Sequence, residues 1–163
     1  MVAGSRPRTP GSGRRVRPSG ASSAQRAALM RRIRQRGTSA ELAVAAVLRA
    51  LGHSYRLNVK KLPGSPDFAN RKRGWALFVH GCFWHHHAGC RRATIPKTNR
   101  AFWRKKFADN RRRDAKALQA LRTAGLSAFV VWECEALEPT LLRERVSDML
   151  EPRRVDVRQP VDH

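Results

Sequence analysis

An eleven-residue segment that begins at His80, HGCFWHHHAGC, holds two of the three cysteines and four of the six histidines of this 163-residue chain. Within it Cys82, His87 and Cys90 have the spacing C-x4-H-x2-C, and Cys134 lies at the end of a predicted strand. Thiolates and imidazoles are the ligands that zinc takes tetrahedrally in closed structural sites. The four side chains therefore predict a Cys3His zinc site that stabilises the fold.

The choice of His87 as the histidine ligand rests on spacing, and His85 or His86 could take its place. The simplest alternative is three ordinary cysteines beside a histidine-rich loop. Three cysteines cannot all pair as disulfides within one chain, and histidines lie between them, so a metal site in a reducing compartment fits the composition better. The start of the chain is basic but lacks the apolar segment of a secretory signal.

A candidate catalytic carboxylate, Asp67, follows Pro66 after the turn-like segment LPGS and precedes the apolar run WALFV. In phosphodiester hydrolysis a carboxylate holds a divalent cation that polarises the phosphate. Pro-Asp is also common in turns, so the interpretation depends on His80 and His85 just past the next strand. A near-neutral imidazole can take a proton from water or give one to a leaving oxygen. The strand WALFVHG lacks the second acidic residue and the lysine that such nucleases usually have there. The histidines would therefore have to take over the roles of those two residues.

Lysine and arginine outnumber aspartate and glutamate by 34 to 12, which gives a net charge of +22. Such an excess favours polyanions through phosphate contacts and counterion release. An anionic membrane surface is the rival partner, but no apolar stretch is long enough to span a bilayer. A glycine-rich phosphate loop is missing, so nucleotide hydrolysis has no support. The composition indicates a metal-containing protein that works on nucleic acid.

The spacing of apolar residues and the signals at helix ends predict the helices and strands that must position these residues. The sequence TSAE at 38–41 is a capping box that begins a helix ending at Gly52. Strands are predicted at residues 55–58, 67–68, 75–79 and 128–133, and further helices at residues 101–124 and 139–150. The strands WALFV and AFVVWE are apolar, as expected of central strands covered on both faces. This order predicts an α/β fold with a mixed central sheet flanked by helices.

We expect three parts along the chain. Residues 1–23, rich in Gly, Pro, Ser and Arg, predict a disordered basic arm that is either a solvated tail or a DNA contact. Residues 24–150 predict a single folded domain that opens with a short basic helix at 24–36. Residues 151–163 predict a polar tail.

Five motifs resemble, in order and spacing, the very short patch repair (Vsr) DNA mismatch endonucleases over about residues 24–136: LPGSPDF, FVHGCFWHHH, PKTNRAFWRKK, NRRRDAKALQALRTAG and VVWEC. The resemblance implies a restriction-endonuclease-like fold of the PD-(D/E)XK type, one structural zinc ion and a catalytic magnesium ion. It also implies an enzyme that nicks DNA on the 5′ side of a thymine mispaired with guanine. That lesion remains when 5-methylcytosine deaminates, and the nick starts very short patch repair.

The resemblance also implies a setting. The substrate would be double-stranded DNA with a T:G mismatch, and the family usually acts beside a cytosine-5 DNA methyltransferase. Mismatch-repair coupling proteins and a repair DNA polymerase would complete the repair. We expect a monomer in the bacterial cytoplasm, associated with the nucleoid and not with a membrane.

Individual roles carry over by position. Asp67 resembles the family's magnesium-binding aspartate, and the backbone carbonyl of Val79 corresponds to a second ligand of that metal. His80 and His85 resemble the active-site histidines, with His85 the better candidate for activating water. Glu41 matches a glutamate near the active site, although its capping role explains it almost as well. The zinc ligands carry over to Cys82, His87, Cys90 and Cys134, with one more residue between the last two loop ligands than in some members.

Three aromatic residues, Phe83, Trp84 and Trp103, match those that wedge into the base stack beside the mismatch in this family. Inserting rings costs a few kcal/mol of unstacking, and the cost is lower at a weakly stacked mismatch. The alternative is that Phe83 and Trp84 are core residues and that Trp103 belongs to the buried stripe of a helix. Phosphate contacts rather than a merely solvated face are predicted for Lys97, Arg104, Lys105, Arg111 and Arg112.

Two rival functions stay open at this stage. One is a related magnesium-dependent DNA nuclease of other specificity. The other is a catalytically inactive, zinc-stapled DNA-binding module, which the presence of Asp67, His80 and His85 disfavours.

Overall fold

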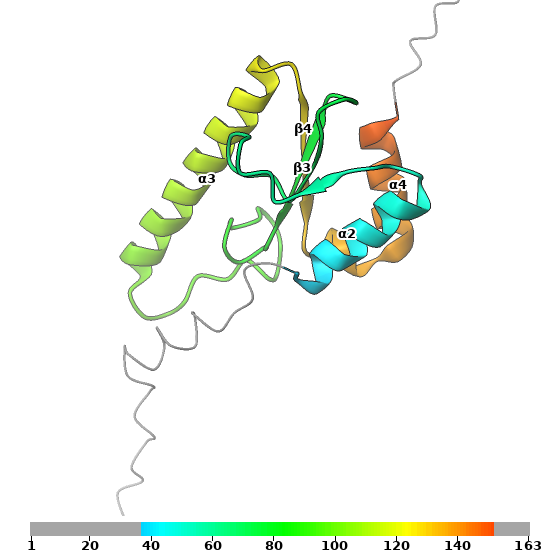
Figure 1. Cartoon of the computed structure of the whole chain (residues 1–163). Coiled ribbons are helices and arrows are strands. Elements are labelled where there is room, and N and C mark those ends of the chain that lie inside the picture. The colour runs from blue at the N-terminus through cyan, green and yellow to red at the C-terminus, as the bar shows by residue number, and fades with distance from the viewer. Residues whose placement is uncertain (1–36, 152–163) are drawn as a thin grey trace, which may run out of the picture. The chain divides into compact units, whose positions relative to one another are not determined.

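Four strands form one mixed sheet in the order β1-β2-β3-β4 in the computed structural model, which describes residues 37–151 (Figure 1). β1 (Arg56–Leu57) pairs antiparallel with β2 (Phe68–Asn70), and β2 pairs antiparallel with β3 (Trp75–His80). β3 pairs in parallel with β4 (Ser127–Trp132). The predicted mixed central sheet is therefore confirmed. The arm at 1–23, the helix at 24–36 and the tail beyond Glu151 lie outside the described residues.

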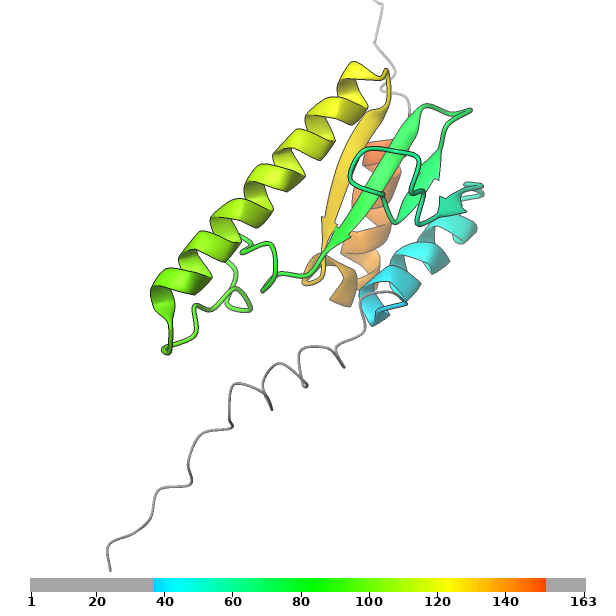
Figure 2. The ribbon, with the colours of Figure 1, turned by 60° about the vertical axis from the view of Figure 1, so that its left-hand side comes forward.

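Helices cover both faces of this sheet. α2 (Ser39–Ala50), the 3-10 turn η1 (Glu135–Leu137) and α4 (Pro139–Leu150) lie on one side, and α3 (Arg100–Thr123) lies on the other (Figure 2). α3 is the crossover that parallel β3 and β4 require. Within residues 37–151, no helix has the length and apolarity needed to cross a bilayer.

Alternate side chains of β3 point to these two layers, because successive residues of a strand face opposite sides. Trp75 and Leu77 join the cluster that contains the buried residues of α2 and α4. Ala76 and Phe78 join the cluster that contains Leu121 of α3. His80 follows the same alternation, so its ring faces the α3 side of the sheet.

The two ends of α2 form as the sequence predicts. The Thr38 hydroxyl accepts a hydrogen bond from the Glu41 backbone N–H at 3.2 Å, and the Glu41 carboxylate accepts from the Thr38 backbone N–H at 3.5 Å. Gly52 takes a positive φ of 74° just beyond the helix, a conformation that glycine adopts without strain. This capping box confirms the structural role expected of Glu41.

Small differences from prediction concern the strand ends. β1 has two residues where four were expected, and both side chains are exposed at the edge of the sheet. β3 continues to His80, because its partner Trp132 extends the parallel ladder to that residue. The catalytic candidate His80 thus lies on the rigid strand and not in the following loop.

Candidate active site and metal centre

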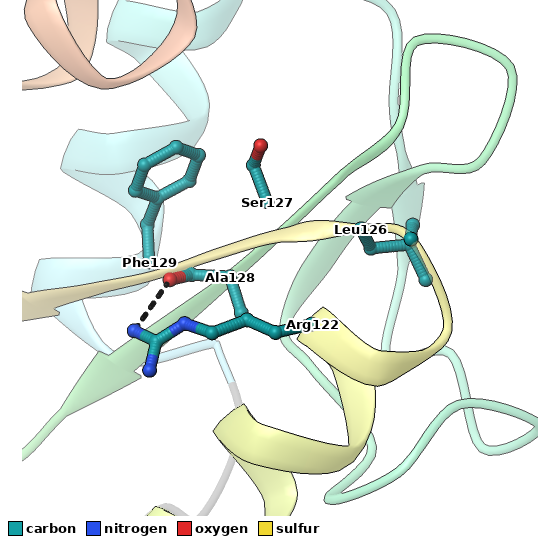
Figure 3. A pocket seen from close by; sticks show the side chains of 6 residues that line it. Arg122, Leu126, Ser127, Ala128 and Phe129 are labelled. Atoms are coloured by element: carbon teal, nitrogen blue, oxygen red, sulfur yellow. Dashed lines mark hydrogen bonds between the residues drawn. The ribbon is translucent and has the colours of Figure 1, made fainter.

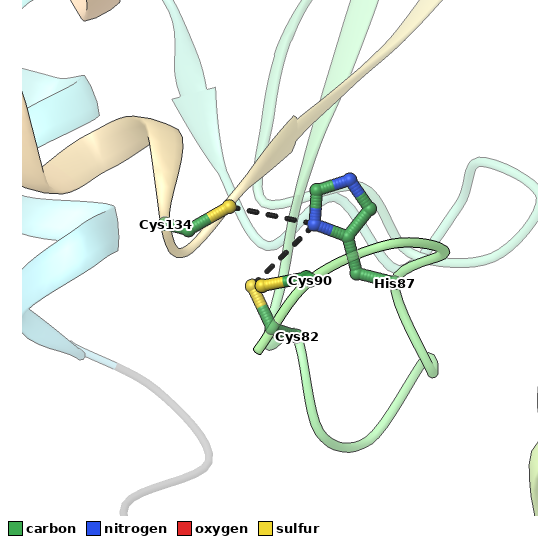
Figure 4. A group of neighbouring side chains, drawn as sticks. All are labelled: Cys82, His87, Cys90 and Cys134. Atoms are coloured by element: carbon green, nitrogen blue, oxygen red, sulfur yellow. Dashed lines mark hydrogen bonds between the residues drawn. The ribbon is translucent and has the colours of Figure 1, made fainter. Parts of the chain in front are cut away.

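The four predicted metal ligands converge beyond the carboxyl ends of β3 and β4 (Figure 4). Parallel strands end at the same edge of a sheet, so Cys82 after β3 lies beside Cys134 after β4. The His87 Nδ1 atom lies 3.8 Å from the Cys82 Sγ atom and 3.4 Å from the Cys134 Sγ atom. Together with Cys90, the ligand atoms all lie within 4.8 Å of one another.

These separations fit a tetrahedral zinc ion. Zinc–sulfur and zinc–nitrogen bonds of about 2.3 and 2.0–2.1 Å place sulfur and nitrogen about 3.6 Å apart. Burial raises the pKa of the Cys82 thiol to about 12 and also raises the pKa of the Cys134 thiol. Sulfurs with a raised pKa are thiols unless a cation favours the thiolate, so the donor set is suited to a metal.

Residues around the cluster hold its ligands in place. The Glu133 carboxylate accepts hydrogen bonds from the Cys82 backbone N–H at 3.3 Å and from the Arg92 guanidinium at 3.1 Å. The His87 ring stacks on Trp132, with ring centroids 4.1 Å apart. Glu133 therefore joins both ends of the ligand loop to β4, a supporting role that the sequence analysis missed.

A second cluster lies next to the metal centre and contains the candidate proton-transfer groups. The His85 Nδ1 atom lies 2.6 Å from the Asp114 Oδ2 atom of α3. The His80 ring stacks on the His85 ring, with centroids 3.8 Å apart and planes within 7°. A carboxylate only accepts, so Nδ1 carries a proton, and in the neutral imidazole Nε2 is then free to accept one.

Asp114 was not recognised in the sequence, although one signal was available. It is an acidic side chain directly after three arginines of a basic helix, and it lies opposite a histidine of the cysteine–histidine segment. The ligand atoms of Asp114, His80 and His85 lie within 4.8 Å of one another, so this group is also compatible with a cation.

The electrostatics of the two histidines differ. His80 is only 7% exposed, and burial, followed by the charge of His85, lowers its pKa to about 4. His80 is therefore neutral near physiological pH and cannot act as a cationic acid. His85 is paired with the carboxylate, so the two imidazoles are suited to different tasks.

Asp67 lies at the same end of β3. Its Oδ2 atom accepts a hydrogen bond from the Val79 backbone N–H at 2.7 Å. Burial raises the pKa of the Asp67 carboxyl, the Val79 N–H opposes that shift, and the charge of Glu41 adds to it. The charge of His85 acts in the opposite sense. The charges of Glu41 and His85 thus both act on the Asp67 carboxyl, while a shared catalytic role for the three residues stays a prediction.

The three predicted wedge residues belong to one aromatic cluster. The Phe83 ring centroid lies 5.1 Å from that of Trp84, 5.3 Å from that of Trp103 and 5.4 Å from that of Phe107. Phe83, Trp84 and Trp103 are half-buried, and Phe102 beside them is 59% exposed. The rings are neither core residues nor isolated at the surface, and their insertion into DNA stays a prediction.

The predicted phosphate-binding side chains are all exposed, and four of them lie on α3. The Lys105 Nζ atom lies 2.8 Å from the Asp109 carboxylate, and Arg112 is paired with the same carboxylate. Because they are exposed, these cations are accessible to a polyanion. Their contact with DNA stays a prediction.

A hollow of ≈ 550 Å³ lies at the other end of β4, lined by Arg122, Gly125, Leu126, Ser127, Ala128 and Phe129 (Figure 3). It contains no carboxylate, histidine or cysteine. The Arg122 guanidinium donates a hydrogen bond to the Ala128 carbonyl at 3.5 Å. The two clusters of metal-ligating and proton-transfer side chains lie instead at the carboxyl ends of β3 and β4.

Comparisons with known proteins identify the family of the chain. The family model described as DNA mismatch endonuclease Vsr matches residues 21–92. A type II nicking enzyme of Xanthomonas oryzae is 41% identical over 124 residues, which cover 76% of this chain and 90% of that protein. The DNA mismatch endonuclease Vsr of Escherichia coli is 36% identical over 132 residues, 78% of this chain and 84% of that protein. A type II nicking enzyme of Neisseria meningitidis is 36% identical over 77% of this chain and 89% of its own length.

Proposed function

This chain belongs to the Vsr family of DNA mismatch endonucleases, and we propose that it nicks double-stranded DNA on the 5′ side of the thymine in a T:G mismatch. The observation that carries the proposal is the 2.6 Å contact between His85 and Asp114. It gives the site an oriented imidazole, whose charge acts on the half-buried carboxylate of Asp67. The lesion is the one left by deamination of 5-methylcytosine, and the nick starts very short patch repair.

The cation of the reaction is magnesium in this proposal. Asp67 would hold it together with the Val79 carbonyl, and its charge polarises the scissile phosphate when it is bound. The N–H and C=O groups of one residue in an extended strand point to the same edge. Because the Val79 N–H donates to Asp67, the Val79 carbonyl faces the same side. Glu41, whose charge acts on Asp67, supports this cation site in addition to capping α2.

The histidines handle the protons. Asp114 orients His85 through Nδ1, so Nε2 accepts the proton of the attacking water. His80, neutral because of its depressed pKa, packs against the flat face of His85 and can donate one hydrogen bond to the phosphate. Together with Pro66-Asp67 directly before β2, this arrangement supports a PD-(D/E)XK-type, restriction-endonuclease-like site in which histidines replace the usual strand acid and lysine.

The metal of the Cys82, His87, Cys90 and Cys134 cluster is zinc in this proposal, and its role is structural. It fixes the loop that carries Phe83 and Trp84, so these rings and Trp103 can open the base stack at the mismatch without first ordering the loop. The exposed cations Lys97, Arg104, Lys105, Arg111 and Arg112 position the duplex through its phosphates. The protein acts as a monomer, and mismatch-repair coupling proteins and a DNA polymerase complete the repair.

The decisive experiment compares nicking of a T:G duplex with nicking of its T:A counterpart in the presence of magnesium. We expect cleavage of the T:G duplex alone, on the 5′ side of the thymine. Equal cleavage of both duplexes would support a nuclease of other specificity, and tight binding without cleavage would support an inactive DNA-binding module.

The Asp67→Ala variant tests the mechanism in the same assay. It should abolish nicking and retain mismatch binding, because it removes the proposed cation ligand and leaves the aromatic cluster intact. Asp148→Ala, at an exposed position of α4, is the matched control and should nick at the wild-type rate. Unchanged nicking by Asp67→Ala would remove this carboxylate from the mechanism.

A further inference from the structure

α3 contacts two consecutive residues of the β3–α3 loop with two side chains that lie one helical turn apart. The Asn110 Nδ2 atom donates a hydrogen bond to the Trp84 carbonyl at 2.7 Å. The Asp114 carboxylate lies 2.6 Å from the Nδ1 atom of His85, the next residue of the loop. Residues four apart are neighbours on one face of a helix. A proposed wedge residue and a proposed catalytic histidine are therefore attached to the same rigid face.

Asn110 is the one polar residue among the three buried residues of α3, beside Phe107 and Leu121. Its side chain is only 8% exposed, and burial of an amide is unfavourable unless the amide is hydrogen-bonded. Its Oδ1 atom accepts a hydrogen bond from the Arg113 guanidinium. Because a guanidinium only donates and a carbonyl only accepts, the amide has one orientation that satisfies both partners.

The loop needs such an attachment. No helix or strand forms between β3 and α3, over residues 81–99, so the tip of the loop is held by turns. The His85 backbone N–H donates to the Gly81 carbonyl at 3.1 Å, and the His86 N–H donates to the Phe83 carbonyl at 3.3 Å. The Trp84 carbonyl lies in the chain between the Trp84 ring and the His85 backbone, so a bond to this atom restrains both side chains.

We propose that Asn110 is a positioning residue that couples mismatch recognition to catalysis. It ties the Trp84 backbone to α3, so that the seating of the Trp84 ring and the orientation of His85 are set by one helix. The inference rests on the proposed function, in which Trp84 contacts the mismatch. It makes Asn110 different from Asp114, because loss of Asp114 affects only the histidine, whereas loss of Asn110 affects the ring and the histidine together.

The test compares Asn110→Leu, which has a similar size and no amide, with Gln119→Leu at an exposed position of the same helix. Hydrogen exchange of backbone amides in residues 81–88 is measured on the free, zinc-loaded proteins. Binding of T:G and T:A duplexes is measured without magnesium, and single-turnover nicking is measured with it. Zinc content and Tm identify any variant that has lost its fold.

We expect Asn110→Leu to exchange about tenfold faster in this loop, as suits the loss of one buried hydrogen bond. Its preference for T:G over T:A should fall about tenfold, and its nicking rate at saturating T:G duplex should fall by at least the same factor. Gln119→Leu should match the wild type in all three measurements. Asp114→Asn should lose nicking and keep the binding preference.

Normal loop exchange, binding preference and nicking in Asn110→Leu would overturn the proposal. If Asn110→Leu fails to bind zinc, Asn110→Asp decides the question, because it keeps the shape and the contact with Arg113 but offers no N–H to the Trp84 carbonyl. A wild-type protein that treats T:G and T:A duplexes alike would refute the proposed specificity. Hydrogen exchange of the loop amides in the Asn110 variants would then still test, independently of specificity, whether Asn110 holds the loop to α3.

Discussion

Replacing Asp114 by asparagine removes the carboxylate that holds His85 and preserves the shape of the side chain. The contact that is lost is a hydrogen bond of 2.6 Å between two side chains that are 26% and 22% exposed. Hydrogen bonds to charged groups contribute about 1.5–3 kcal/mol, which corresponds to about 10- to 150-fold in rate. Asparagine can also donate to Nδ1 and so move the imidazole proton to Nε2, which removes the proposed base.

Because both effects act in the same direction, we expect nicking by Asp114→Asn to fall about 100-fold, near the upper end of that range. The assay is single-turnover nicking of a labelled T:G duplex with magnesium and enzyme in excess. Mismatch binding should be unchanged, since Asp114 does not contact the aromatic cluster. Asp148→Asn supplies the same change of charge at an exposed site on α4. A fall of less than about threefold would refute the role of Asp114 as the residue that orients His85.

Three further perturbations concern the Cys3His cluster and Asp67. Cys134→Ser should lose zinc and fold together, because a structural zinc contributes about 10–16 kcal/mol and a domain has about 5–15 kcal/mol of net stability; a zinc-free variant with a native circular dichroism spectrum and Tm would contradict this. Glu133→Gln weakens the support of the Cys82 N–H and should lower zinc affinity about 10- to 100-fold in a chelator competition; unchanged affinity would remove it from the support of the site. Asp67→Asn should raise the Tm at pH 7 in the absence of divalent cations, because burial raises the pKa of this carboxyl. A raised folded-state pKa means that ionisation opposes folding, so stability falls as pH rises through that pKa; a lower Tm for this variant would contradict the sign.

The residues that sequence predicted are those whose signals are local. The spacing C-x4-H-x2-C, the capping box at Thr38 and the apolar runs of β3 and β4 each lie within a few residues of one another. Only Cys134 had to be assigned across a long separation, and it was found because no other cysteine remained. Parallel pairing of β3 with β4 then brings it to the other three ligands.

The residues that sequence missed depend on the crossover. Asp114 meets a histidine 29 positions away, Asn110 meets the Trp84 carbonyl 26 positions away, and Glu133 meets the Cys82 N–H 51 positions away. Whether such groups meet depends on the path of the β3–α3 loop and on where α3 is placed relative to β3 and β4. Periodicity along a helix shows which side is buried, but it does not show which loop atoms lie opposite that side.

The proposed proton acceptor occupies a vulnerable place in the chain. His85 lies between two ligands of the Cys3His cluster, Cys82 and His87, so the geometry of hydrolysis depends on sulfur chemistry. Peroxide converts metal-binding cysteines to sulfenic acids or disulfides and so releases the ion. Because the ion and the fold are lost together, an oxidised cell would lose this enzyme through its loop, and thiol reductants and resupplied metal would be needed before the chain could refold and its activity return.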